Sequence, residues 1–251
     1  MTTHYWQHVE FEDPALETAR RELHAPTGAL GVDEAFLALL RSGRTVAVSI
    51  ALDMYSAEER TSRWGFANPL QEHADEVLER AREVLRRPPM PATDSGAAHD
   101  GADHASALGA MMNLARPDDA DLLAAVLRAP ASSEVLLTAC MAADGALWAD
   151  EPSSELIAAL GEIVFDTART TDQRKDALRA LGNVEASSVA DIAVRAAQGE
   201  DAELRSTAVA VLATAHLSTH RPLVEEFFAA CPRTDPNYLN IRDQLEDAGN
   251  A

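Results

Sequence analysis

The stretch that decides the fold lies towards the C-terminus, where DALRALGNVEASSVADIAVRAAQ (residues 176–198) is followed by STAVAVLATAHLSTHRPLVEEFFAA (residues 206–230). Each segment reads as a helix of small residues, a short polar turn and a second helix with apolar residues at helical spacing. An equivalent alanine recurs at Ala107, Ala139, Ala177 and Ala208, at spacings of 32, 38 and 31 residues. Two-helix units at such a period predict an all-α fold, an α-solenoid of stacked antiparallel helix pairs.

Helical periodicity and capping residues place further helices along most of the chain. In the N-terminal part we expect helices at 14–24, at 34–42 with Asp33 as its cap, at 45–56 and at 70–87. In the C-terminal part we expect helices at 104–114, 119–127, 133–143, 154–167, 172–181, 187–198, 202–215, 221–230 and 236–247. Side chains that suit the starts of these C-terminal helices are Ser153, Ser154, Thr171, Asp172, Ser187 and Asp201.

A break in the pattern suggests how the chain is divided. Residues 88–101 (PPMPATDSGAAHDG) contain three prolines and a run of small residues, which do not sustain a helix. We therefore predict a divergent N-terminal helical part with one possible repeat at 1–87, a linker or long loop at 88–101, and regular repeats with a capping helix at 102–251. The segment 57–69 reads as a loop, whose Trp64 either contacts a partner or anchors the loop on the repeats.

The composition limits the classes of partner. The 251 residues carry a net charge of −20, of which residues 1–90 contribute −5 and residues 91–251 contribute −15. Nucleic-acid-binding proteins normally present a basic surface to phosphate, so binding to nucleic acid or to an anionic membrane is not expected. A cationic protein is the partner that such a chain would attract, although acidity also simply keeps a protein in solution. Because aromatic residues make up only 5% of the chain, the core must consist of Ala, Leu and Val.

The remaining general features suggest a cytoplasmic protein. Cys140 and Cys231 both fall within predicted helices, where we expect buried free thiols. The first 14 residues (MTTHYWQHVEFEDP) lack the basic and apolar regions of a signal peptide. No apolar run approaches the roughly 18 residues that a membrane span requires.

The segment at 171–213 (TDQRKDALRALGNVEASSVADIAVRAAQGEDAELRSTAVAVLA) resembles HEAT repeats of the short bacterial type. The positions that carry the resemblance are Arg174, Ala177, Leu178, Gly182, Val189, Ile192, Glu200 and Asp201. HEAT-like families include scaffolds, lyase-like chromophore-binding proteins, a diiron hydroxylase and alkylpurine DNA glycosylases, so the resemblance implies a fold and not a reaction. The hydroxylase would require His-Glu dipeptides, which this chain lacks, and only Trp148 beside Asp150 suggests the glycosylase.

The resemblance also implies a binding surface, because second helices line the concave face of HEAT-type stacks. The acidic residues expected on that face are Asp121, Glu155, Glu162, Asp166, Asp191, Glu225 and Glu226, and the basic exceptions are Arg128 and Arg195. A mainly acidic face would complement a cationic protein or peptide. The sequence therefore predicts a non-enzymatic protein-binding module (an adaptor, scaffold or neutraliser) that uses these residues and Trp64.

Catalytic, metal and cofactor sites are not predicted. The motif HDGADH supplies His99, Asp100, Asp103 and His104, which could bind Zn²⁺ or Mn²⁺ but more simply form a helix cap and a solvated loop. The pair His216 and His220 has metal-binding spacing, but the intervening residues indicate a turn. No nucleophile or phosphate-binding motif is present. The alternative function is a small-ligand-binding or lyase-like enzyme, with a pocket where the N-terminal part meets the solenoid.

Overall fold

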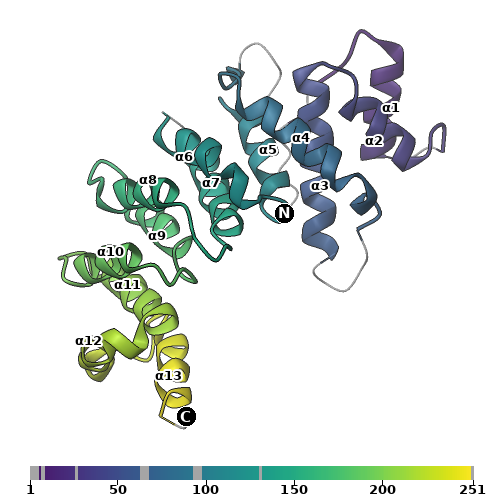
Figure 1. Cartoon of the computed structure of the whole chain (residues 1–251). Coiled ribbons are helices and arrows are strands. Elements are labelled where there is room, and N and C mark those ends of the chain that lie inside the picture. Colours follow the sequence, from purple (N-terminus) through teal and green to yellow (C-terminus); the bar gives the residue numbers. More distant parts are fainter. Residues whose placement is uncertain are drawn as a thin grey trace. The chain divides into compact units, whose positions relative to one another are not determined.

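The computed structural model describes residue 6 and residues 9–25, 28–62, 68–92, 98–129 and 132–249. These residues form thirteen α-helices and no strand, which confirms the predicted all-α class (Figure 1). Within the same residues, no helix combines the length and apolar character needed to cross a membrane. The chain divides into two compact units, one comprising 1–115 with 129–145 and the other 116–128 with 146–251. The segment 88–101 belongs to the first unit.

Unit 1 contains six helices and a short 3₁₀ turn. They are α1 (Pro14–His24), α2 (Val32–Leu40), α3 (Thr45–Ser62), η1 (Gln71–His73), α4 (Ala74–Leu85), α5 (Ala102–Met111) and α7 (Ser133–Ala146). Helix α5 packs against α3 and α4, and α1 packs against α2. Trp6, which precedes α1 in the chain, is 2% exposed and donates from its indole Nε1 to Ser106 Oγ at 3.0 Å.

Unit 2 contains seven helices and a second 3₁₀ turn. They are η3 (Pro117–Asp119), α6 (Ala120–Arg128), α8 (Ser154–Phe165), α9 (Thr171–Arg179), α10 (Ser187–Ala197), α11 (Ala202–Ala215), α12 (Leu217–Ala230) and α13 (Tyr238–Asp247). Helix α8 contacts both α6 and α10, while α9 contacts α11. The approach of α8 to α10 is close, because a Cβ built on Gly161 would lie 2.9 Å from Ile192 Cδ1.

Local capping explains several of the helix starts. Ser153 and Asp201 accept hydrogen bonds from backbone N–H groups of α8 and α11, as predicted. Helix α9 begins with a reciprocal capping box between Thr170 and Gln173, so the predicted caps Thr171 and Asp172 are wrong.

Other helix boundaries also differ from the prediction. Helix α2 is capped by Gly31, with Asp33 in its first turn, and α10 follows Ala186 without a side-chain cap at Ser187. Helix α3 continues to Ser62, beyond the expected end at residue 56, and the expected helix at 70–87 is divided into η1 and α4. Helix α12 begins at Leu217, but non-helical torsions at His220 divide it close to the start predicted at 221.

The HDGADH motif is divided between a turn, in which Asp100 is exposed as predicted, and the start of a helix. Because α5 begins at Ala102, Asp103 and His104 lie inside it and are buried. The Asp103 carboxylate accepts the backbone N–H of Met90 at 3.0 Å, and a ring nitrogen of His104 lies 3.0 Å from the carbonyl oxygen of Arg87. Both side chains therefore hold the start of the proline-rich segment against α5. The predicted cap is also wrong, since the N-cap residue is Gly101, at φ 75°.

Replacing Asp103 tests this attachment. Because Asp103→Ala leaves the Met90 N–H without its acceptor, we expect the unfolding free energy of unit 1 to fall by about 1–3 kcal/mol. Glu34→Ala, which removes the same charge from an exposed position on α2, should change it by less than about 0.5 kcal/mol. In a Trp148→Phe background the remaining tryptophans belong to unit 1, so urea unfolding can be followed by their fluorescence. Equal effects of the two substitutions would contradict the assignment.

Candidate functional site

The acidic residues predicted to bind a partner all lie in unit 2 and are all exposed. Asp121 is on α6, Glu155 and Glu162 are on α8, Asp191 is on α10, Glu225 and Glu226 are on α12, and Asp166 follows α8. Trp64, the remaining predicted residue, lies outside the described residues. Since α8 contacts both α6 and α10, the acidic residues of these three helices are carried by neighbouring elements.

Two of these carboxylates are already engaged by one arginine. The Arg128 guanidinium, at the end of α6, donates to Glu162 Oε1 at 2.9 Å and to Glu155 Oε1. The hydrogen bonds from Arg128 hold the pKa of the Glu162 carboxyl below its usual value. Arg128 thus links α6 to α8, and its single positive charge offsets one of the two negative charges of Glu155 and Glu162. The sequence contained all three residues, but not their contact across 27 and 34 positions.

The other members of the set differ in their pairing. Asp166 lies 3.5 Å from Arg169, and Glu225 lies 3.2 Å from Arg221. Three of the predicted carboxylates have no hydrogen bond or ion pair within the described part of the chain; these are Asp121, Asp191 and Glu226. We call these three residues the free acidic set. The second predicted basic exception, Arg195, lies with its guanidinium carbon 3.9 Å from the centre of the Phe165 ring.

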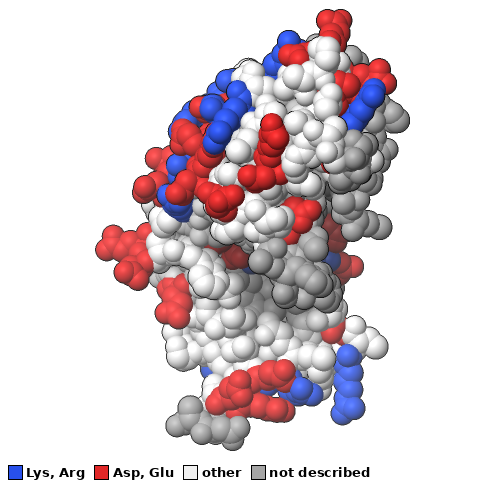
Figure 2. Space-filling view, turned by 90° about the vertical axis from the view of Figure 1, so that its right-hand side faces the viewer, with Lys and Arg blue, Asp and Glu red and all other residues white. Residues whose placement is uncertain are grey.

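The charge of the chain is shared between its units. Unit 2 contains 21 acidic and 11 basic residues and unit 1 contains 20 and 10, so each carries a net charge of −10. The view in Figure 2 shows acidic side chains in several separate groups, many of them beside basic ones, with broad uncharged areas. A large aromatic surface also occurs in unit 2, because Trp148 is 71% exposed. Net charge alone therefore does not locate a partner-binding surface.

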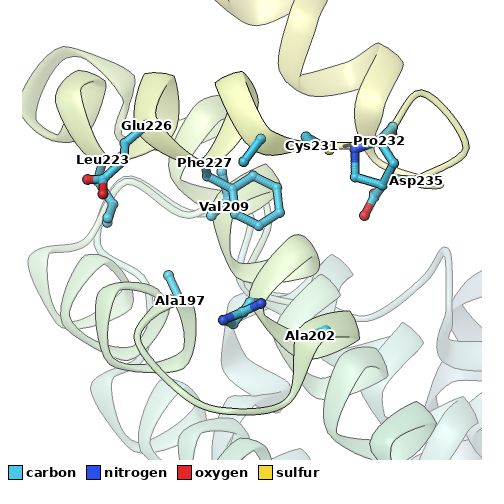
Figure 3. Close-up of a pocket in the computed structure, with 11 residues that line it drawn as sticks. Ala197, Ala202, Val209, Leu223, Glu226, Phe227, Cys231, Pro232 and Asp235 are labelled. Atoms are coloured by element: carbon cyan, nitrogen blue, oxygen red, sulfur yellow. Dashed lines mark hydrogen bonds between the residues drawn. The ribbon is translucent and has the colours of Figure 1, made fainter.

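A pocket lies between α11, α12 and the turn that follows α12 (Figure 3). Its volume of about 440 Å³ is in the range of small-molecule sites. Its lining residues are Ala197, Ala202, Arg205, Val209, Leu223, Glu226, Phe227, Ala230, Cys231, Pro232 and Asp235. Figure 3 shows Glu226 and Asp235 at opposite ends, with Phe227 between them. This pocket lies wholly within unit 2.

The polar groups of the pocket differ in whether they have hydrogen-bond partners. Asp235 accepts from Ser206 Oγ at 2.6 Å and from the backbone N–H of Asn237 at 2.8 Å. Cys231 is half-buried, and burial followed by the charge of Asp235 raises the pKa of its thiol, so the thiol stays protonated at neutral pH. This cysteine ends α12 and is less buried than predicted, whereas Cys140 is buried as expected. The Nε of Arg205 is buried without a hydrogen-bond partner.

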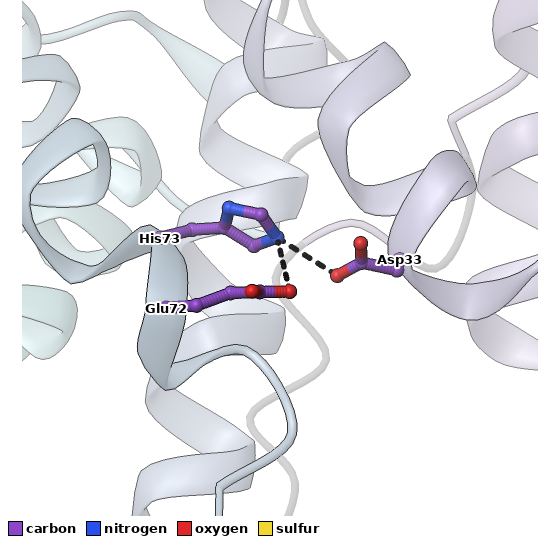
Figure 4. A group of neighbouring side chains, drawn as sticks. All are labelled: Asp33, Glu72 and His73. Atoms are coloured by element: carbon purple, nitrogen blue, oxygen red, sulfur yellow. Dashed lines mark hydrogen bonds and ion pairs between the residues drawn. The ribbon is translucent and has the colours of Figure 1, made fainter.

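One group in unit 1 could hold a divalent cation (Figure 4). His73 Nε2 lies 2.8 Å from Asp33 Oδ1 and 3.7 Å from Glu72 Oε1, and its ring stacks on Phe36 with centroids 5.8 Å apart. Such donors suit zinc. Among the described residues no other set of three comparable side chains converges, those of the HDGADH motif included. The hydrogen bond from His73 to Asp33 by itself accounts for the geometry, and it fastens η1 to the first turn of α2.

The residues between the predicted histidine pair in unit 2 form the first turn of α12 and not the expected turn between helices, because the bend between α11 and α12 lies at His216 and the kink at His220. His216 is buried and its Nε2 has no hydrogen-bond partner. Desolvation by burial lowers the pKa of His216, against the opposing effect of a hydrogen bond with the Val184 backbone, while the charge of His220 lowers it further. His216 is thus a neutral core residue at neutral pH.

In comparisons with known proteins, the chain matches no family model, no curated protein and no solved structure.

The lowered pKa of His216 predicts a dependence of stability on pH. Because the unfolded chain binds this proton at its ordinary pKa of 6.5 and the folded chain only at lower pH, the unfolding free energy should fall as pH decreases through that value. His216→Asn removes the contribution, so its unfolding free energy should decline less than that of the wild type from about pH 7 to about pH 5. Urea titrations followed by far-UV circular dichroism measure both slopes. Identical slopes would show that burial of His216 does not influence its protonation.

Proposed function

We propose that this chain is a non-enzymatic protein-binding module and that a cationic segment of its partner binds the second-helix surface of unit 2. The observation that carries the proposal is the free acidic set, which consists of exposed carboxylates on α6, α10 and α12 without intramolecular partners. A cation that approaches them does not have to displace an existing ion pair. Complementary charges of this kind raise the association rate and favour the correct partner.

The arrangement of unit 2 supports an α-solenoid of the HEAT type as the architecture of this module. The second helices α6, α8 and α10 contact one another in order, and the first helices α9 and α11 do the same. Two such rows of neighbouring helices are what stacked antiparallel pairs produce. In this proposal the second helices line the concave side, where an extended segment could contact several repeats at once.

The ion pairs of the basic residues also favour the second helices as the binding surface. Arg128 is held by Glu155 and Glu162, and Arg221 lies beside Glu225. Each arginine offsets one negative charge, so Glu155 and Glu162 together keep one net charge, whereas each carboxylate of the free acidic set keeps its full charge. Trp148 is a possible additional contact, since exposed tryptophans often contribute strongly to binding energy.

Charge reversal of the free acidic set tests the location of binding. We expect Asp121→Arg, Asp191→Arg and Glu226→Arg together to weaken binding of a fluorescent decaarginine peptide by about tenfold or more at low salt. The control combines Glu151→Arg, Glu200→Arg and Asp247→Arg, which are exposed positions of unit 2 outside the second-helix surface. Both variants change net charge equally, so any general attraction between the acidic chain and the peptide falls equally. If fluorescence anisotropy shows the same loss of peptide affinity for both variants, the peptide binds either at another site or without a defined site.

Arg128, which pairs with two carboxylates of α8, provides a test in which peptide binding is expected to become stronger. Arg128→Gln releases Glu155 and Glu162, so we expect the same peptide to bind several-fold more tightly. Arg233→Gln is the matched control, because Arg233 is exposed and has no ion pair within the described chain. It removes the same charge without releasing a carboxylate. Equal gains from the two substitutions would show that only net charge matters, which would argue against a defined surface.

A further inference from the structure

The pocket between α11 and α12 contains one positively charged group, Arg205, and the described chain forms no ion pair with it. Arg205 is half-buried, its Nε is buried without a hydrogen bond, and no described residue forms an ion pair with it. Buried polar groups are nearly always paired in folded proteins, and each exception calls for an explanation. Seven other basic residues of unit 2 form ion pairs, whereas Arg195 lies over the Phe165 ring and Arg233 is exposed; the seven are Arg128, Arg169, Arg174, Lys175, Arg179, Arg221 and Arg242.

The carboxylates of the pocket and of the neighbouring chain form no ion pair with Arg205. Asp235 lines the same pocket, but Ser206 and the backbone of Asn237 donate to it. Asp201, one turn before Arg205 on α11, accepts from Thr171 Oγ1 at 2.8 Å and from the backbone N–H of Leu204 at 3.1 Å. Glu226 lies at the end of the pocket opposite Asp235 and is exposed to solvent. No described carboxylate bonds to the Arg205 guanidinium, and its two Nη groups are not buried, so they can meet an acceptor from outside.

The other lining residues of the pocket suit the apolar part of a ligand. Val209 is buried in α11, and Leu223 and Phe227 face the pocket from α12. The alanines at 197, 202 and 230 leave the space open because they carry only a methyl group. The protonated thiol of Cys231 adds no charge. A ligand that fills this volume would thus bury hydrocarbon against three larger apolar side chains and place a single anionic group on Arg205.

We propose that this pocket binds a small amphiphilic carboxylate, whose carboxylate accepts hydrogen bonds from Arg205 and whose apolar chain packs on Val209, Leu223 and Phe227. Guanidinium and carboxylate match in shape and form charge-assisted hydrogen bonds. A monovalent head group is favoured over a phosphate, because Glu226 and Asp235 at the two ends repel additional negative charge. The site is separate from the proposed partner-binding function, although Glu226 borders both.

Octanoate is the probe that tests this inference, with octanol and octylammonium as ligands of equal chain length but different charge. Isothermal titration calorimetry on the full chain should show octanoate binding at a single site, and octanol binding at least about tenfold more weakly. Arg205→Gln should weaken octanoate binding by a similar factor and leave octanol binding unchanged. Arg233→Gln removes an equal charge from outside the pocket and should bind octanoate as the wild type does.

A second variant keeps the test independent of Arg205. Ala230→Leu fills the pocket from its exposed rim and should reduce the affinity for octanoate without altering the guanidinium. Far-UV circular dichroism of each ligand-free variant confirms that it is folded. The proposal is overturned if the wild type does not bind octanoate, if octylammonium or octanol binds as tightly, or if Arg205→Gln binds octanoate as well as Arg233→Gln does.

Discussion

The burial of α11 is the constraint on which unit 2 depends. This helix contacts α9, α10, α12 and α13, and every residue from Leu204 to Ala213 except Arg205 is buried. A helix enclosed on all sides has no solvent-facing stripe, so it must be built mainly from small and apolar residues, and its buried hydroxyl groups need hydrogen-bond partners. Thr207 illustrates this, because its hydroxyl donates to the carbonyl oxygen of Glu203 one turn earlier. The Ala- and Val-rich sequence of α11 follows from its central position.

The same constraint determines where charge can be placed. Because α11 has almost no charged surface, the acidic residues of unit 2 are carried by the outer helices and by helix starts, where the helix dipole favours them. Their effect on a partner then depends on local pairing. Glu155 and Glu162 together contribute one net negative charge because they share Arg128, whereas Asp121 and Asp191 contribute one each. Recognition therefore depends on the unpaired charge on one surface. Net charge does not measure this quantity, because both units carry the same net charge.

Sequence reasoning succeeded where structure is determined locally. The position of α11 agrees with the prediction at both ends, because apolar periodicity and the Asp201 cap are contained within the helix and its first turn. It failed where distant segments meet. Asp103 looks like a cap in the sequence, but the returning backbone at Met90 makes it a buried acceptor. His73 and Asp33 are 40 positions apart, and nothing in either local sequence indicates that they form a hydrogen bond.

Arg205 shows most clearly what the sequence alone does not reveal. In the linear pattern it is one polar residue near the start of a helix, where an exposed arginine would need no explanation. In the fold it interrupts a buried run and lies in a cavity of about 440 Å³. Asp201, one turn earlier in the chain, and Asp235, in the same pocket, are engaged in capping and turn contacts, so they cannot rotate towards it without breaking those hydrogen bonds. A ligand that supplies its own carboxylate meets no such competition. The fixed geometry of the surrounding turns thus keeps Arg205 available, which is the preorganisation that a binding site requires.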